Sequence, residues 1–240
     1  MTEGTNTGDI RAFWDKRARE FGEGGEATLR EKYLRRLEIK TILRAIRQIH
    51  PVTVLDMGCG NGFATKVYAR QFPQMRFVGV DFSEEMILQA NRTPVPNCVF
   101  VAGDVLDPGS IPDGPYDMII TQRCLQNIPE TQSQIRAIYN LIAKRSPGGV
   151  LCLIECSKDG VKLLQNWRRR LGRKPLDDVE PWHNNFVIDK SLIDGFGATV
   201  VHFSSSYMIL TKLVHPKLAP LGYLFPSIGT FGYDKLYVIR

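Results

Sequence analysis

The stretch Val52-Thr53-Val54-Leu55-Asp56-Met57-Gly58-Cys59-Gly60-Asn61-Gly62 decides the fold. It opens with a short apolar, β-branched run, which predicts a buried strand. The strand ends in Asp56, and glycines spaced G-x-G-x-G follow at once. Glycine lets the backbone turn tightly and lets a ligand approach without a Cβ in the way. Since apolar residues at helical spacing come next, the stretch predicts a strand, a ligand-binding loop and a helix.

The same alternation continues along the chain. We expect further strands at 77–81, 99–104, 116–121 and 150–155, with helices between them, and we expect Pro147-Gly148-Gly149 to end the helix before the last of these. Strands 198–203 and 234–239 would pair antiparallel at the C-terminal edge of the sheet. The pattern predicts an α/β fold, a doubly wound and mostly parallel seven-stranded sheet of the Rossmann-like kind.

Length and composition predict one domain over residues 1–240. Hydrophobic residues make up 43% of the chain and charged residues 23%, which is typical of a soluble globular protein. Within it we expect an N-terminal helical cap at about 9–50 and an insertion at about 157–195. The five cysteines form no CxxC pair and no zinc-like cluster, and no signal peptide is apparent, so we expect free thiols, no metal and a cytoplasmic location.

Two segments bear on membranes and nucleic acids. The least charged long stretch, 213–231, contains Pro216, Lys217, Pro220 and Pro226, so we expect no spanning helix, although it could touch a membrane surface or line an apolar pocket. The net charge of +6 comes partly from the basic run 168–174. We interpret that run as a solvated helix face rather than a nucleic-acid site.

The glycine loop departs by one residue from the G-x-G-x-x-G of dinucleotide enzymes. It resembles motif I of the class I S-adenosylmethionine-dependent methyltransferases. Asp81, Gly103-Asp104, Tyr116-Asp117 and Pro147-Gly148-Gly149 fall in that family's order and spacing, so the resemblance covers nearly the whole chain. Three pieces of the C-terminal third also resemble methyltransferases of sugar and polysaccharide biosynthesis: Glu155, Leu164-Gln165-Asn166-Trp167-Arg168 and Pro181-Trp182-His183-Asn184.

The resemblance implies a cofactor site at three strand ends. Asp81 would accept both ribose hydroxyls; its alternative role is to cap the following helix. Asp104 would accept from the adenine amino group, with Val105 facing the ring; alternatively Asp104 binds its own backbone. The implied site also includes Asp56, Gly58, Gly60, Asn61, Phe82 and Met86.

Other residues would complete the cofactor site. Trp14 is either an aromatic that closes over the cofactor or a surface residue, and Arg30 either meets the methionine carboxylate or is solvated. Gln122 and Arg123 are expected to contact cofactor or acceptor. Cys124 has no adjacent proline, so we interpret it as a packing residue rather than a nucleophile.

Methyl transfer to a hydroxyl needs a base, whereas an amine needs only a free lone pair. His183 is the candidate base, expected with Trp182 over the carboxyl ends of the strands; its alternative is a packed loop histidine. Glu155, the other candidate, holds either a substrate hydroxyl or a loop backbone. We expect methylation of a hydroxyl or amine on a small-molecule acceptor such as a sugar or glycan precursor. The alternatives are an RNA- or protein-modifying methyltransferase and a non-catalytic cofactor-binding regulator.

Overall fold

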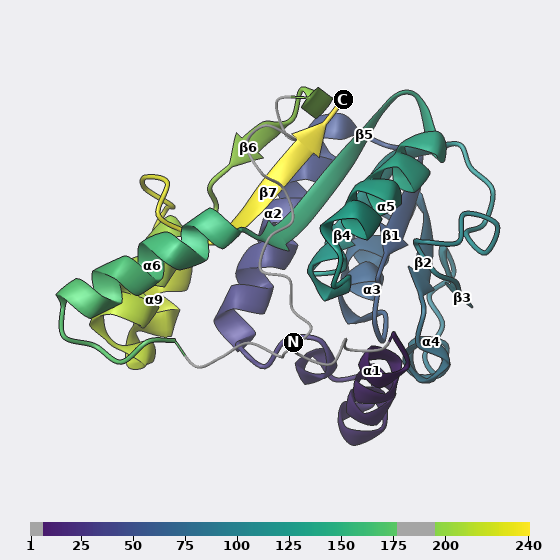
Figure 1. Ribbon diagram of the computed structural model, residues 1–240. Coiled ribbons are helices and arrows are strands. Elements are labelled where there is room, and N and C mark those ends of the chain that lie inside the picture. The colour runs from purple at the N-terminus through teal and green to yellow at the C-terminus, as the bar shows by residue number, and fades with distance from the viewer. Residues whose placement is uncertain (1–6, 177–194) are drawn as a thin grey trace.

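The computed structural model describes residues 7–176 and 195–240. A sheet of seven strands, ordered β3-β2-β1-β4-β5-β7-β6, runs through the molecule (Figure 1). The strands are β1 (Thr53–Met57), β2 (Arg76–Asp81), β3 (Cys98–Ala102), β4 (Tyr116–Gln122), β5 (Arg145–Cys156), β6 (Thr199–Val201) and β7 (Asp234–Ile239). All pairs from β3 to β5 are parallel, and β7 is antiparallel to both β5 and β6. The predicted sheet, with its antiparallel C-terminal edge, is confirmed.

Helices cover both faces of this sheet. The longer ones are α1 (Thr7–Phe21), α2 (Lys32–Ile49), α3 (Phe63–Gln71), α4 (Glu84–Ala90), α5 (Thr131–Ala143) and α6 (Lys158–Arg170). Residues of α2 and α3 pack with Val54 on one face, and residues of α5 pack with Leu55 on the other. Because β1 is buried on both faces, its sequence is an apolar run rather than an alternating one.

Pro147-Gly148-Gly149 lies inside β5 and not before it, so that expectation was wrong. Tyr116 of β4 pairs with Arg145, whereas Met118 pairs with Val150, and the residues between them form an irregularity in the ladder. A bulge tolerates proline because it leaves a residue unpaired, so β5 can begin earlier than its apolar run suggested.

A helical layer follows β6. It consists of α8 (Ser205–Met208), the π-helical η3 (Ile209–Val214), η4 (Pro216–Leu218) and α9 (Ala219–Leu224). Two short 3-10 helices lie earlier in the chain: η1 (Gly25–Ala27) and η2 (Leu125–Asn127). Pro216 and Pro220 occupy first-turn positions of η4 and α9. A first turn accepts proline, since its N–H groups have no helical acceptor. None of the described residues forms a helix long and apolar enough to cross a membrane.

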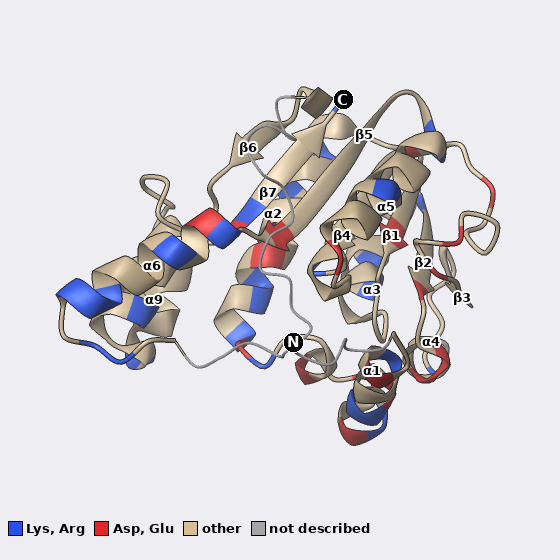
Figure 2. Ribbon diagram, viewed as in Figure 1, with Lys and Arg blue, Asp and Glu red and all other residues tan. Residues whose placement is uncertain are grey.

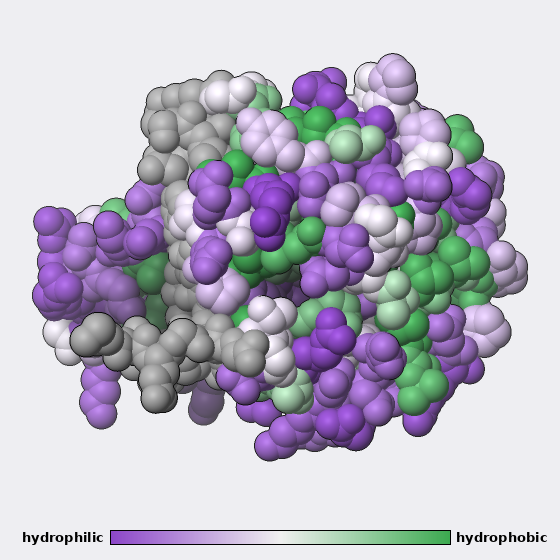
Figure 3. Space-filling model, turned by 45° about the vertical axis from the view of Figure 1, so that its right-hand side comes forward, coloured by the Kyte–Doolittle hydropathy of each residue, from purple (hydrophilic) through white to green (hydrophobic). Residues whose placement is uncertain are grey.

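Only part of the predicted cap lies over the strand ends. Helix α1 packs against α4 beside the carboxyl ends of β1 and β2, whereas α2 lies along a face of the sheet (Figure 1). Helix α6 leads away from β5 and packs against η3, so the basic run sits at the far end of the molecule from α1 (Figure 2). The face in Figure 3 is mostly hydrophilic, with apolar residues gathered near its centre and on its right.

Candidate functional site

A cavity of about 300 Å³ opens at the carboxyl ends of the central strands. In doubly wound sheets this is where ligands bind, because the connections diverge there to opposite faces. Its walls come from the glycine loop, the ends of β2 and β4, the turns after β3 and β4, helix α1 and the start of β7. The lining residues are Thr7, Ile10, Trp14, Thr28, Leu29, Glu31, Leu34, Met57, Gly58, Gly60, Asp81, Phe82, Met86, Asp104, Val105, Leu106, Gln122, Arg123, Cys124, Gln126, Asn127, Ile128, Pro129, Cys156, Tyr233 and Asp234.

The glycine loop is needed for close packing as well as for ligand access. Gly58 has φ +76°, and a Cβ there would lie 2.6 Å from the Cβ of Cys124. Gly60 has φ +56°, and its Cβ would lie 2.4 Å from the Cγ2 of Thr28. Both positions therefore require glycine, because the neighbouring segments fill the space a side chain would take.

Asp81 presents a carboxylate to the cavity. Its Oδ2 accepts from the backbone N–H of Gly60 at 2.8 Å, and its Oδ1 accepts from the N–H of Ser83 at 3.0 Å. A carboxylate oxygen can accept two hydrogen bonds, so each retains capacity for one more donor. Burial raises the pKa of Asp81 to about 6. A vicinal diol supplies two donors, one for each oxygen of this carboxylate, so Asp81 fits a ribose. The cap of α4 is Ser83, whose hydroxyl accepts from the N–H of Met86.

The adenine side is formed by the turn after β3. Asp104 lines the cavity and its Oδ1 also accepts from the N–H of Leu106 at 2.9 Å, which is the local backbone contact named as its alternative role. Val105, Phe82 and Met86 line the same wall. Apolar side chains around one carboxylate suit a flat heterocycle with a polar edge.

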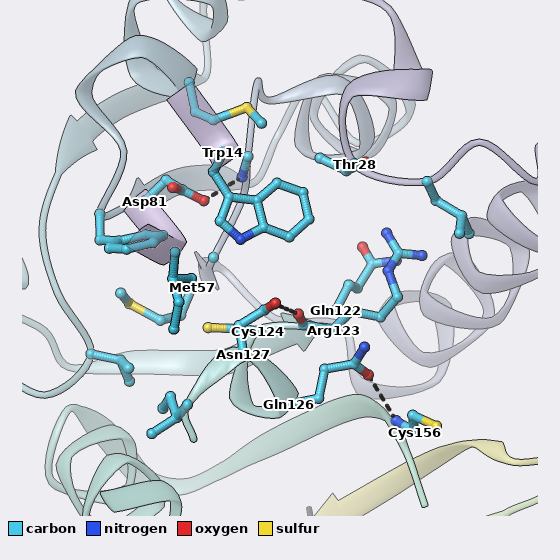
Figure 4. Close-up of a pocket in the computed structure, with 18 of the residues that line it drawn as sticks. Trp14, Thr28, Met57, Asp81, Gln122, Arg123, Cys124, Gln126, Asn127 and Cys156 are labelled. Carbon is cyan, nitrogen blue, oxygen red and sulfur yellow. Dashed lines mark hydrogen bonds between the residues drawn. The ribbon is translucent and has the colours of Figure 1, made fainter. Parts of the chain in front are cut away.

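Trp14 projects from α1 into the cavity and lies between Asp81 and the end of β4 (Figure 4). Helix α1, which carries Trp14, is hydrogen-bonded to the start of α4, because Asp15 accepts from the hydroxyl of Ser83 at 2.5 Å. Asn61 donates to the carbonyls of Gly22 and Gly24 at 2.7 and 2.8 Å. The N-terminal segment is therefore held directly against the glycine loop.

Two residues predicted for the cofactor site, Asn61 and Asp56, lie behind the glycine loop and do not line this cavity. Asn61 is fully buried beneath the loop and serves the N-terminal segment instead. Asp56 is also buried; it accepts from the hydroxyl of Thr65 at 2.6 Å, and burial raises its pKa to about 6. Both therefore shape the loop from behind.

Gln122 and Arg123 line the cavity as expected. Gln122 accepts from the hydroxyl of Tyr68 at 2.6 Å. The guanidinium of Arg123 donates to both carboxylate oxygens of Glu38, at 2.7 and 2.9 Å, in a pair whose side chains are 15% and 1% exposed. Cys124 packs on Gly58, and burial raises the pKa of its thiol well above the usual value, which agrees with a packing role.

Of the two roles expected for Glu155, the structure has the loop-holding one. Its carboxylate is fully buried and does not line the cavity. It accepts from the Thr121 hydroxyl at 2.8 Å and from the N–H groups of Cys124, Leu125 and Gln126 at 3.1 to 3.2 Å. Glu155 thus shapes the turn after β4, and a catalytic contact with substrate is not available to it in this structure.

The remaining expectations fall outside the cavity. Arg30 is exposed, with its guanidinium 5.7 Å from the ring centre of Phe21, so it does not face the cofactor site. His183 and Trp182 lie outside the described residues. Within the predicted insertion, none of the described residues of α6 lines the cavity.

Several residues that line the cavity were not predicted from the sequence, among them Thr28, Glu31 and Asp234. Thr28 precedes α2 and touches Gly60. Asp234 begins β7, where an acid followed by an apolar run was the only local signal. Its place in the cavity wall depends on residues that are distant in sequence, such as Glu31 and Arg123.

Comparison with known proteins places this geometry in a family. A family model described as a methyltransferase domain matches residues 50–186. The chain is 33% identical over 100 residues to a trans-aconitate 2-methyltransferase of Deinococcus radiodurans, covering 42% of this chain and 36% of the relative. It is 31% identical over 170 residues to the Escherichia coli O17:K52:H18 (strain UMN026) protein of the same name, covering 67% and 65%. The matched region thus spans less than two thirds of either relative.

A solved structure shares the fold over the whole chain. The SAM-dependent methyltransferase of Anabaena variabilis ATCC 29413 superposes with a TM-score of 0.64 at 16% identity, covering 99% of this chain and 96% of that one. At this identity the likeness concerns the fold alone.

Proposed function

Because this chain belongs to the family of methyltransferase domains, we propose that it transfers a methyl group from S-adenosylmethionine to a hydroxyl or amine of a small-molecule acceptor. The observation that carries the proposal is the cavity at the strand ends, where the Asp81 carboxylate faces inward beside Gly58 and Gly60. A dinucleotide is disfavoured, since the loop is one residue shorter than a pyrophosphate-binding one.

The residues of the cavity have distinct tasks. When bound, S-adenosylmethionine supplies an electrophilic methyl group whose leaving group is a neutral thioether. Asp81 binds the ribose hydroxyls, and Asp104 with Val105 binds the adenine edge. Trp14 closes the cavity and excludes water, which helps hold the reacting atoms in line at about 3 Å.

The volume of the cavity supports a small acceptor. At about 300 Å³ it lies at the low end of ligand pockets, which leaves little room beside a cofactor. The basic run at the end of α6 lies apart from it, so a nucleic acid bound there would be far from the methyl donor. A sugar or glycan precursor is one acceptor of suitable size. The names of the relatives introduce a second candidate, a carboxylate acceptor such as trans-aconitate.

Calorimetry with S-adenosylhomocysteine tests the donor assignment. We expect binding by the wild-type chain and a loss of at least about 10-fold in affinity for Asp81→Ala, since two hydrogen bonds to a carboxylate are worth roughly 3 kcal/mol or more. Asp113→Ala is the matched control, because that carboxylate is fully exposed and pairs with Lys144 on the surface, outside the cavity. Undiminished affinity in Asp81→Ala, or tighter binding of NAD, would overturn the assignment.

A further inference from the structure

In the wall of this cavity lies a buried carboxylate, one oxygen of which has no hydrogen-bond partner among the described residues. Asp234 opens β7, opposite Cys156 at the carboxyl end of β5, and is 3% exposed. It lines the same cavity as Gly58 and Asp81. Its Oδ2 makes no hydrogen bond to any described residue. Buried polar atoms are nearly always paired, so this oxygen is suited to a donor that the protein itself does not provide.

The cations near Asp234 are already engaged by other acids. Arg123 binds Glu38 through two hydrogen bonds, and Lys212 donates to Glu31 at 2.8 Å. Each of these cations is therefore matched by another carboxylate, and the ion pairs of the described residues leave Asp234 without a cation of its own.

The surroundings keep that carboxyl group basic. Burial, then the charge of Glu38, raises the pKa of Asp234 well above its usual value, while Arg123 and Lys212 lower it. Tyr233, which also lines this end of the cavity, is held neutral because burial raises its pKa. Asp234 is thus the group in this wall best able to take up a proton.

We propose that Asp234 binds the nucleophilic O–H or N–H group of the acceptor and takes up its proton when the methyl group is transferred. This inference rests on the proposed function. The acceptor oxygen or nitrogen forms a bond to the methyl carbon, the carbon–sulfur bond breaks with its electron pair going to sulfur, and the acceptor's proton moves to Oδ2 of Asp234. Charge and atoms balance without any further reactant.

The same residue discriminates between classes of acceptor. A carboxylic acid is ionised at neutral pH, so it has neither a proton to give to Asp234 nor a donor for its Oδ2. An alcohol or amine supplies the donor that Oδ2 lacks. The acceptor of this chain is therefore a nucleophile that carries an O–H or N–H group. Trans-aconitate, which the names of its relatives contain, is then not an acceptor of this chain.

The test compares Asp234→Asn with Asp113→Asn, which removes an exposed carboxylate of the same kind. Methyl transfer is measured against neutral saccharides, amino sugars and trans-aconitate, and S-adenosylhomocysteine affinity is measured by calorimetry. We expect Asp234→Asn to lower kcat for the best alcohol or amine by about 100-fold or more, since general-base removal typically costs that much. Cofactor affinity should stay within about 2-fold, and any residual transfer to trans-aconitate should not fall. A merely structural role would lower transfer to all acceptors together.

The outcomes separate this inference from the proposed function. If the wild-type chain does not bind S-adenosylhomocysteine, the proposed function fails. If it binds, but Asp234→Asn turns over unchanged, only the role of Asp234 is refuted. If trans-aconitate is the best acceptor, both the role of Asp234 and the hydroxyl or amine acceptor are refuted, while the donor assignment stands.

A measurement on the wild-type protein covers the case in which the variant does not fold. Saturation-transfer NMR on the chain loaded with S-adenosylhomocysteine compares butylammonium with butyrate. We expect a stronger signal from butylammonium, and equal signals or a stronger one from butyrate would overturn the proposal.

Discussion

Removing the cation of the buried Arg123–Glu38 pair, by Arg123→Met, should strongly destabilise the protein. Glu38 lies on α2 with its side chain 1% exposed, and both its oxygens accept from the same guanidinium nitrogen. Methionine matches the stem of arginine but leaves the carboxylate in the interior without its cation. Losing one partner of such a pair costs about 3–5 kcal/mol, because the remaining charge is buried and unpaired.

The double variant Glu38→Met/Arg123→Met isolates the pair itself. Replacing both partners by apolar residues leaves no unpaired charge, so its unfolding free energy should lie within about 1–2 kcal/mol of wild type. The single variant would lose a large part of a typical domain stability of about 5–15 kcal/mol.

The stability of Arg123→Met should depend on pH in a direction that follows from the pKa of Glu38. Burial raises the pKa of Glu38, and Arg123 opposes that rise. Without Arg123 the folded state binds the proton of Glu38 more tightly than the unfolded state does, so stability is lost as pH rises. The deficit of Arg123→Met should thus be smallest below about pH 4, where Glu38 is mostly protonated in both states, and should grow toward pH 7.5.

Urea denaturation followed by circular dichroism at several pH values measures these quantities. A single variant within 1 kcal/mol of wild type at pH 7.5, as an order-of-magnitude limit, would refute the reasoning. So would a double variant as unstable as the single one, since that would mean packing rather than charge accounts for the loss.

Two further predictions concern the cofactor side. Protonation of Asp81, whose pKa burial raises to about 6, should remove its capacity to bind two hydroxyls, so calorimetric affinity for S-adenosylhomocysteine should fall about 10-fold per pH unit below pH 6; a flat profile from pH 5 to 8 would contradict this. Asn61→Ala should cost about 1–3 kcal/mol of unfolding free energy and also weaken cofactor binding, because the carbonyls of Gly22 and Gly24 lose their donor. Unchanged affinity together with the lost stability would show that the N-terminal segment does not contribute to the cofactor site.

The central sheet could be predicted because its signals are local. The strand at 234–239 was predicted with its observed bounds. Errors arose where a residue has two structural meanings. Proline breaks a helix when it lies in the interior, but it is tolerated in the first turn. Pro216 and Pro220 were interpreted as helix breakers, whereas they lie in the first turns of η4 and α9. Pro147 likewise suggested a break but occupies an irregularity within β5.

The cofactor side of the site was also largely predictable. Asp81 and Asp104 each end or follow a strand, and in a parallel sheet those ends share one edge. Asn61 was assigned to the cofactor because it sits inside the glycine motif, whereas its side chain points backward to Gly22 and Gly24. A motif specifies where the backbone turns, but the direction of each side chain depends on segments that pack behind it.

The acceptor side has no comparable local signal, and this explains why family membership identifies the donor more readily than the acceptor. The cofactor walls come mainly from residues 57–60, 81–86 and 104–106, which follow consecutive strands. The opposite wall joins Glu31, Arg123 and Asp234, which lie far apart in the chain and whose net charge depends on Glu38 and Lys212 behind them. A substitution at any of these five positions changes the charge of this wall, while the donor residues at the strand ends stay the same. The charge of this wall is therefore the property to compare when acceptors are assigned.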